Sequence, residues 1–176
     1  VESLDANTSG NGNTAIGISA LGTCSTGSSN TALGQGALFA YTVSGGTGLG
    51  YFALNANTTG TKNTAVGYYA GKTITTGPNN TAIGYEALRD CETNGENTAV
   101  GAESLMNNTS ANNTGIGWYA GRVNTTGNHN TFLGRAAAHQ NTTGSYNVAL
   151  GGGALSTNTT TSYHTAVGYS ALSENT

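Results

Sequence analysis

A five-residue motif recurs along the whole chain at a nearly constant interval. Its first full copy is the pentapeptide NTAIG, which ends at Gly17, and successive copies end 16 or 17 residues apart. A fixed internal period of this kind indicates an array of stacked structural repeats. We therefore expect residues 1–176 to form a single repeat array, a segment of a longer fibre with partial repeats at 1–12 and 164–176. The repeat glycines are Gly17, Gly34, Gly50, Gly67, Gly84, Gly101, Gly117, Gly134, Gly151 and Gly168.

The repeat length and its residue types favour an all-β, parallel β-solenoid. A repeat of 16 or 17 residues is too short for the helical pairs of other repeat proteins, and its Thr, Asn, Gly and β-branched residues disfavour a helix. We expect about ten coils, each with two short strands and two turns. Coils stacked at the ~4.8 Å strand spacing would give a rod about 50 Å long.

The fourth residue of the pentapeptide is aliphatic in every copy, and alternating side chains place it on the face opposite the preceding alanine. In one arrangement the alanines line a narrow coil, and the aliphatic column is an outer stripe that packs against other copies of the chain. In the other, the aliphatics lie inside the coil and the chain is a monomer. The sequence leaves both open. This candidate inter-chain or core stripe is Ile16, Leu33, Leu49, Val66, Ile83, Val100, Ile116, Leu133, Leu150 and Val167.

The pentapeptide followed by two variable residues and Ala-Leu resembles the head repeat of YadA-like trimeric autotransporter adhesins. It is similar also to the NTAVG-type repeats of phage and bacterial tail-fibre-like proteins. The resemblance covers essentially the whole chain. It implies a left-handed β-roll, a side-by-side homotrimer, and a fibre outside the cell, on a cell or virion surface. The repeats here are longer than those of the adhesins, which implies an enlarged turn.

Composition and spacing argue against several other classes of protein. Charged residues make up 7% of the chain, so no basic patch exists to bind nucleic acid. No run approaches the ~20 apolar residues of a membrane span. His129, His139 and His164 occupy three different repeat positions, and no side chains have the spacing of a metal site, a cofactor loop or a catalytic motif. We therefore expect neither an enzyme nor a cofactor.

The two cysteines share one repeat position. Cys24 and Cys91 lie four coils apart, which corresponds to ~19 Å in a stacked solenoid. A disulfide requires Cα atoms within about 7 Å. We therefore expect no intramolecular disulfide.

Nine asparagines begin Asn-x-Ser/Thr sequons, and six of them share the repeat position of the cysteines. One hypothesis is a column of glycans on a surface turn. The alternative is that Asn-Thr-Thr-Gly is simply favourable turn chemistry. An intact mass equal to that of the bare polypeptide would exclude the glycans. The candidate N-glycosylation sites are Asn7, Asn57, Asn79, Asn107, Asn108, Asn112, Asn124, Asn141 and Asn158.

Two more columns have structural interpretations. The asparagine that opens most repeats is expected to form a hydrogen-bonded ladder along the solenoid. The position after the repeat glycine is aromatic in five copies, which predicts stacked rings over a turn or at a chain interface, or a platform for sugars. These aromatic residues are Tyr51, Tyr68, Tyr85, Trp118 and Tyr169.

Three function classes follow. We favour a structural, non-catalytic extracellular fibre or adhesin shaft, whose partners are other copies of itself, side by side or end to end, with surface glycans or a host receptor as further partners. A threonine column from Thr14 to Thr165 makes ice binding the first alternative, which thermal hysteresis would detect. A carbohydrate-binding receptor tip that uses the aromatic column is the second.

Overall fold

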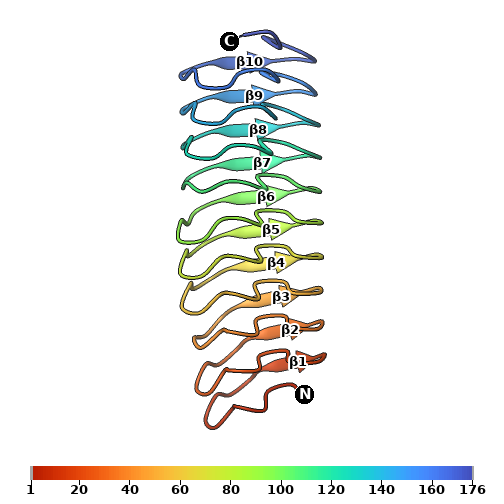
Figure 1. The fold of residues 1–176 in the computed structure, drawn as a ribbon, viewed down its shortest axis with the longest axis vertical. Helices are drawn as coiled ribbons and strands as arrows, with labels where there is room; N and C mark the ends of the chain where they lie inside the picture. The colour runs from red at the N-terminus through yellow and green to blue at the C-terminus, as the bar shows by residue number, and fades with distance from the viewer. Residues whose placement is uncertain (1, 176) are drawn as a thin grey trace.

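The computed structural model describes residues 2–175 as a rod of stacked coils (Figure 1). Each coil contributes one three-residue strand to a single ten-stranded sheet, whose strands follow one another in sequence order. No helix is present over 2–175. The strands are β1 Thr14–Ile16, β2 Thr31–Leu33, β3 Thr47–Leu49, β4 Thr64–Val66, β5 Thr81–Ile83, β6 Thr98–Val100, β7 Thr114–Ile116, β8 Thr131–Leu133, β9 Val148–Leu150 and β10 Thr165–Val167.

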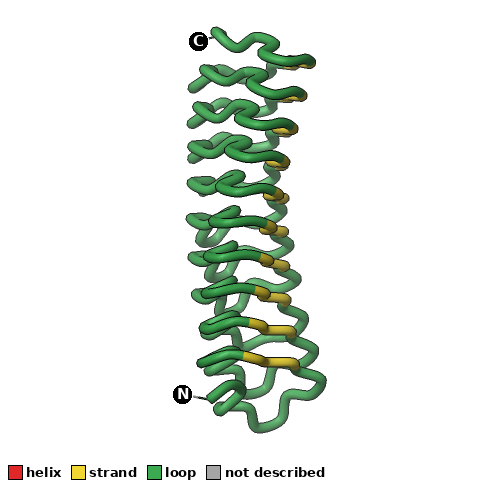
Figure 2. Tube along the Cα trace, turned by 90° about the vertical axis from the view of Figure 1, so that its right-hand side faces the viewer, coloured by secondary structure: helices red, strands yellow, loops and turns green. Residues whose placement is uncertain are grey.

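Every strand pairs in parallel with its neighbour, and each residue lies beside its own counterpart in the next repeat. For example, Ala65 of β4 is in register with Ala82 of β5. The strands therefore form one continuous strip along one side of the rod (Figure 2). The predicted parallel β-solenoid is confirmed.

Within the described residues, no helix is long and apolar enough to cross a membrane.

The expectation of a second strand in each coil is wrong. The rest of the coil turns through three residues with left-handed backbone, as at Tyr69 (φ 57°), Leu88 (φ 50°) and Asn79 (φ 59°). A residue in this region cannot continue a strand, so each of the three makes a corner. Hydrogen bonds between coils persist at these corners, as in the N–H of Leu54 donating to the carbonyl oxygen of Ala70 over 3.0 Å.

The repeat glycine follows each strand at a point where the backbone of the next coil is close. Gly84 has φ 136°, and a Cβ on it would lie 2.5 Å from the carbonyl oxygen of Gly101 in the next coil. Backbone atoms cannot give way as a flexible side chain can. This contact explains why the fifth residue of the pentapeptide is glycine in all ten copies.

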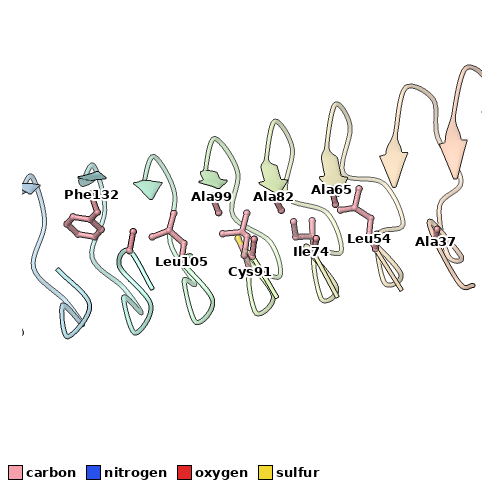
Figure 3. Packing of buried hydrophobic residues seen from close by; sticks show 14 of the residues in the cluster. Ala37, Leu54, Ala65, Ile74, Ala82, Cys91, Ala99, Leu105 and Phe132 are labelled. Atoms are coloured by element: carbon pink, nitrogen blue, oxygen red, sulfur yellow. The ribbon is translucent and has the colours of Figure 1, made fainter. Parts of the chain in front are cut away.

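Small side chains fill the coil interior. The alanine of the pentapeptide and a second alanine, five residues further on, both point inward, as Ala65 and Ala70 do with no exposed surface. A leucine directly after the second alanine points inward as well. Figure 3 shows these residues stacked along the rod, with Leu54 and Leu105 among the larger ones.

The core departs from small residues where a leucine is missing. Gly121 replaces the inward leucine, and Phe132 replaces the alanine of β8; a Cβ on Gly121 would lie 2.4 Å from Cδ2 of Phe132. Gly71 likewise replaces a leucine beside Ile74, whose Cδ1 would lie 3.0 Å from the added Cβ. The large ring or side chain therefore occupies the volume that the leucine has elsewhere.

Candidate functional site

The outward side of the sheet is an uncharged strip of threonines and aliphatics, which we call the strand face. Because the alanines point inward, the aliphatic column lies on the outer face of the coil and not in its interior. Seven aliphatics of the stripe are exposed, from 37% at Ile116 to 64% at Val167, and the other three, Leu49, Val66 and Val100, are half-buried. An isolated chain thus exposes an apolar stripe over the full length of the rod.

Two exposed corners border the strand face. The residue after the repeat glycine follows each strand, and the residue before the opening asparagine precedes it. We call these columns the trailing ridge and the leading ridge. From β2 to β10 the trailing ridge is Gln35, Tyr51, Tyr68, Tyr85, Ala102, Trp118, Arg135, Gly152 and Tyr169, and the leading ridge is Ser29, Gly45, Lys62, Asn79, Glu96, Asn112, His129, Tyr146 and Tyr163.

Three of the five predicted aromatics of the trailing ridge, Tyr51, Tyr68 and Tyr85, stack on one another. The rings of Tyr51 and Tyr68 lie 5.2 Å apart at 12°, and those of Tyr68 and Tyr85 lie 5.5 Å apart at 10°. Trp118 stacks on Tyr119, with ring centroids 3.7 Å apart. The Arg135 guanidinium lies 4.9 Å from the centroid of the Trp118 ring. Because the rings face one another along the rod, they present mainly their edges to solvent.

Three of the five Lys and Arg residues lie over aromatic rings in or next to the trailing ridge: Lys72 over Tyr69, Arg122 over Tyr119 and Arg135 over Trp118. Arg89 forms ion pairs with Glu86 (2.7 Å) and Asp90 (2.8 Å). Arg122 pairs with Glu103 over 2.6 Å. These contacts are within the chain, so the cluster is close to charge balance rather than a basic patch.

Sequence reasoning missed the aromatic stack of the leading ridge. The rings of His129 and Tyr146 lie 4.9 Å apart, and those of Tyr146 and Tyr163 lie 5.2 Å apart at 1°. The signal was present, because these three residues are spaced by 17 positions and each precedes the first residue of a pentapeptide.

The glycan column on a surface turn is wrong for most of its members. Asn57, Asn108, Asn124, Asn141 and Asn158 have no exposed surface and point into the coil. A buried amide nitrogen cannot carry a glycan in the folded chain. Of the remaining candidates, Asn7 and Asn107 are half-buried, whereas Asn79 and Asn112 are exposed at corners of the leading ridge.

Four of the buried members, Asn108, Asn124, Asn141 and Asn158, form a ladder instead. Nδ2 of Asn141 donates to Oδ1 of Asn124 over 2.6 Å, and Nδ2 of Asn158 donates to Oδ1 of Asn141 over 2.8 Å. Each of these amides also reaches a backbone carbonyl of its own turn, as Asn141 does at Gly144 (2.9 Å). The sequon pattern is therefore a by-product of interior asparagines followed by turn residues.

The asparagine that opens the repeat forms a second ladder, as predicted. Oδ1 of Asn80 accepts from the backbone N–H of Asn97 (3.0 Å), and Nδ2 of Asn80 donates to the carbonyl oxygen of Asn94 (3.0 Å). The bonds join each side chain to the backbone of the next coil. The same pair of bonds recurs at Asn13, Asn30, Asn63, Asn97, Asn113, Asn130 and Asn147.

The remaining reactive side chains make no chemical centre within residues 2–175. Cys24 and Cys91 form no disulfide with each other, as the spacing predicts; both are buried, and burial raises the pKa of Cys91 to about 11. No cluster of metal-ligating side chains occurs in this part of the chain. An open pocket of about 290 Å³ lies between Phe39 and Phe52, where Gly36 has no side chain, and no titratable group lines it.

Comparisons with protein families, with curated proteins and with solved structures find no match to this chain. The resemblance to adhesin head repeats and tail-fibre-like arrays therefore stays a prediction from the motif.

Proposed function

We propose that the chain is a stretch of an extracellular fibre or adhesin shaft, in which three copies pack side by side through their strand faces. The observation that carries the proposal is the uninterrupted aliphatic stripe on the outer face of the rod, whose members are exposed or half-buried on every coil. An apolar stripe of this length on a soluble protein marks an interaction surface. A neighbouring copy has the same stripe at the same spacing, so packing copies against one another would cover it.

The contacts between coils suit a mechanical role. Both asparagine ladders and the parallel sheet join each coil to the next, so the load along the rod is spread over many hydrogen bonds per coil. The interior is filled by alanines, leucines and asparagine amides, with a few larger side chains such as Phe132. On this account the fold serves to provide length and stiffness.

A paired substitution on the strand face tests the proposal. Ile83→Asp combined with Val100→Asp places carboxylates on the stripe without touching the alanine core, and we expect the trimer to dissociate into folded monomers. Thr76→Asp, at an exposed turn away from the strand face, is the matched control and should leave the assembly intact. Light scattering reads the mass and circular dichroism reads the fold. An assembly that survives the paired change contradicts the strand face as the interface.

Ice binding is the second candidate, because the strand face presents Thr14, Thr31, Thr131 and Thr165 among its exposed residues at a regular repeat. The aliphatic partner of each threonine makes this face less polar than a threonine pair would. Thermal hysteresis of a dilute solution tests the idea, and its absence would remove it. A sugar platform is disfavoured, because the stacked rings of Tyr51, Tyr68 and Tyr85 cover one another's faces.

A further inference from the structure

The strand face alone is narrow for a stable assembly. A strand of three residues is roughly 10 Å long, and this length is the width of the strand face. Ten coils spaced by ~4.8 Å extend about 48 Å along the rod, so the strand face has a flat area on the order of 480 Å². Stable interfaces bury about 800 Å² on each partner. A side-by-side assembly therefore needs surface beyond the strands, and the two ridges are the surfaces that border them.

The two ridges differ in bulk at the same level of the rod. Beside β3, Gly45 precedes the strand and Tyr51 follows it; beside β9, Tyr146 precedes and Gly152 follows. Trailing rings predominate beside β3, β4, β5 and β7, and leading rings beside β8 and β9. Only β10 has a tyrosine on both ridges, Tyr163 and Tyr169.

Stacking along the rod explains why rings occur in runs on each ridge, but it does not explain why the two runs lie mostly at different levels. The strand separates the two ridges, so six residues of nearly extended backbone place them on the order of 15 to 20 Å apart. Side chains at that distance do not compete for volume. Contact between the ridges of different copies would couple them, because a ring on one copy then requires a small or complementary residue on the other.

We propose that the leading ridge of one copy packs against the trailing ridge of the next, level by level, to form the seams of the assembly. Three copies related by a common threefold axis have corresponding coils at equal height. The leading ridge of each copy then meets the trailing ridge of the next, and the third copy meets the first, which closes the ring. At β9 the ring of Tyr146 then covers Gly152 of the neighbour, and at β4 the Lys62 ammonium faces the ring of Tyr68, a cation–π pair. The inference rests on the side-by-side assembly proposed above.

Paired cysteines test the seam. Tyr146→Cys combined with Gly152→Cys places one thiol on each ridge at β9, and Gly152 has room, since the nearest atom to an added Cβ is 3.5 Å away on Tyr169. The two positions are too far apart for a bond within one chain. Mild oxidation should therefore yield covalent dimers and trimers on a gel without reductant, and the monomer band should fall several-fold. Asn79→Cys with Tyr85→Cys at β5 repeats the test on a second level.

The controls separate the possible outcomes. Each single-cysteine variant should stay monomeric on the gel, and cross-linking of Tyr146→Cys alone would mean that like ridges meet, which overturns the seam. Native mass spectrometry of the reduced double variants measures their oligomeric state. A trimer in which neither pair cross-links overturns the seam and leaves the proposed function standing. A folded monomer overturns both.

Discussion

Oδ1 of Asn63 accepts a hydrogen bond from the backbone N–H of Asn80, 2.7 Å away in the next coil. Both residues are buried, so no solvent is available to satisfy that N–H. Nδ2 of Asn63 donates over 2.7 Å to the carbonyl oxygen of Gly77, three residues before Asn80. One short side chain thus pairs two backbone groups of its neighbour, which explains why asparagine opens so many of the repeats.

Asn80→Ala should destabilise the rod by about 2 to 5 kcal/mol, because it leaves the N–H of Asn97 and the carbonyl of Asn94 unpaired inside the coil. Asn79→Gly, next to it but exposed and left-handed, should change little. Thermal unfolding followed by circular dichroism measures the difference. Equal midpoints for the two variants, with the amide of Asn97 still protected from hydrogen exchange, would contradict the ladder.

Gly84→Ala should cost about 2 to 5 kcal/mol, since its Cβ would meet the backbone of Gly101 and its φ of 136° strains a side chain. Gly152→Ala is the matched control, because an added Cβ there makes only ordinary contacts with Tyr169. Denaturant unfolding of both variants is the measurement. If the two glycines tolerate alanine equally well, close contact between coils does not explain the repeat glycine.

Phe132→Ala should leave a cavity and cost about 3 to 5 kcal/mol, and Gly121→Leu alone should clash with the phenyl ring. The double variant restores the residues found in most other repeats, so we expect it to recover much of the lost stability. A double-mutant cycle from unfolding curves measures the coupling. Additive losses would show that the two sites do not share one volume.

The thiol of Cys91 should be unreactive in the folded chain. Burial raises its pKa to about 11, so at pH 8 it is both shielded and protonated, and alkylation should modify it only after unfolding. The unfolded thiol ionises first, near its ordinary pKa of 9.0, so this group favours folding below that pH and its contribution is lost as pH rises towards about 11. Rapid labelling of native protein at pH 8 would contradict the buried placement.

Much of the architecture follows from the sequence, because the pentapeptide fixes both period and register. The inward alanine and outward aliphatic were one of two possible arrangements, and the choice depends on how tightly the coil closes. Left-handed corners such as Tyr69 and Leu88 set the width of the coil, and neither tyrosine nor leucine is a residue type that favours a left-handed backbone. Tyrosine, serine, glutamate and leucine occupy these corners in different repeats, and these residue types do not distinguish a strand from a turn.

The interior asparagines were misplaced for a related reason. Asn57 is followed by Thr58, Thr59 and Gly60, which is typical of an exposed turn, yet the Asn57 amide donates inward to the carbonyl oxygen of Gly60 over 3.1 Å. Cysteine, tyrosine and isoleucine at the same position in other repeats indicate burial, and that mixture was the informative signal.

Native mass spectrometry of the unmodified chain tests the central claim most directly. The account predicts one species at three times the 17.6 kDa of the chain, since three copies together cover the aliphatic stripe. A folded species at 17.6 kDa, unchanged over a wide range of concentration, would show that the stripe remains exposed in solution and would contradict the side-by-side fibre.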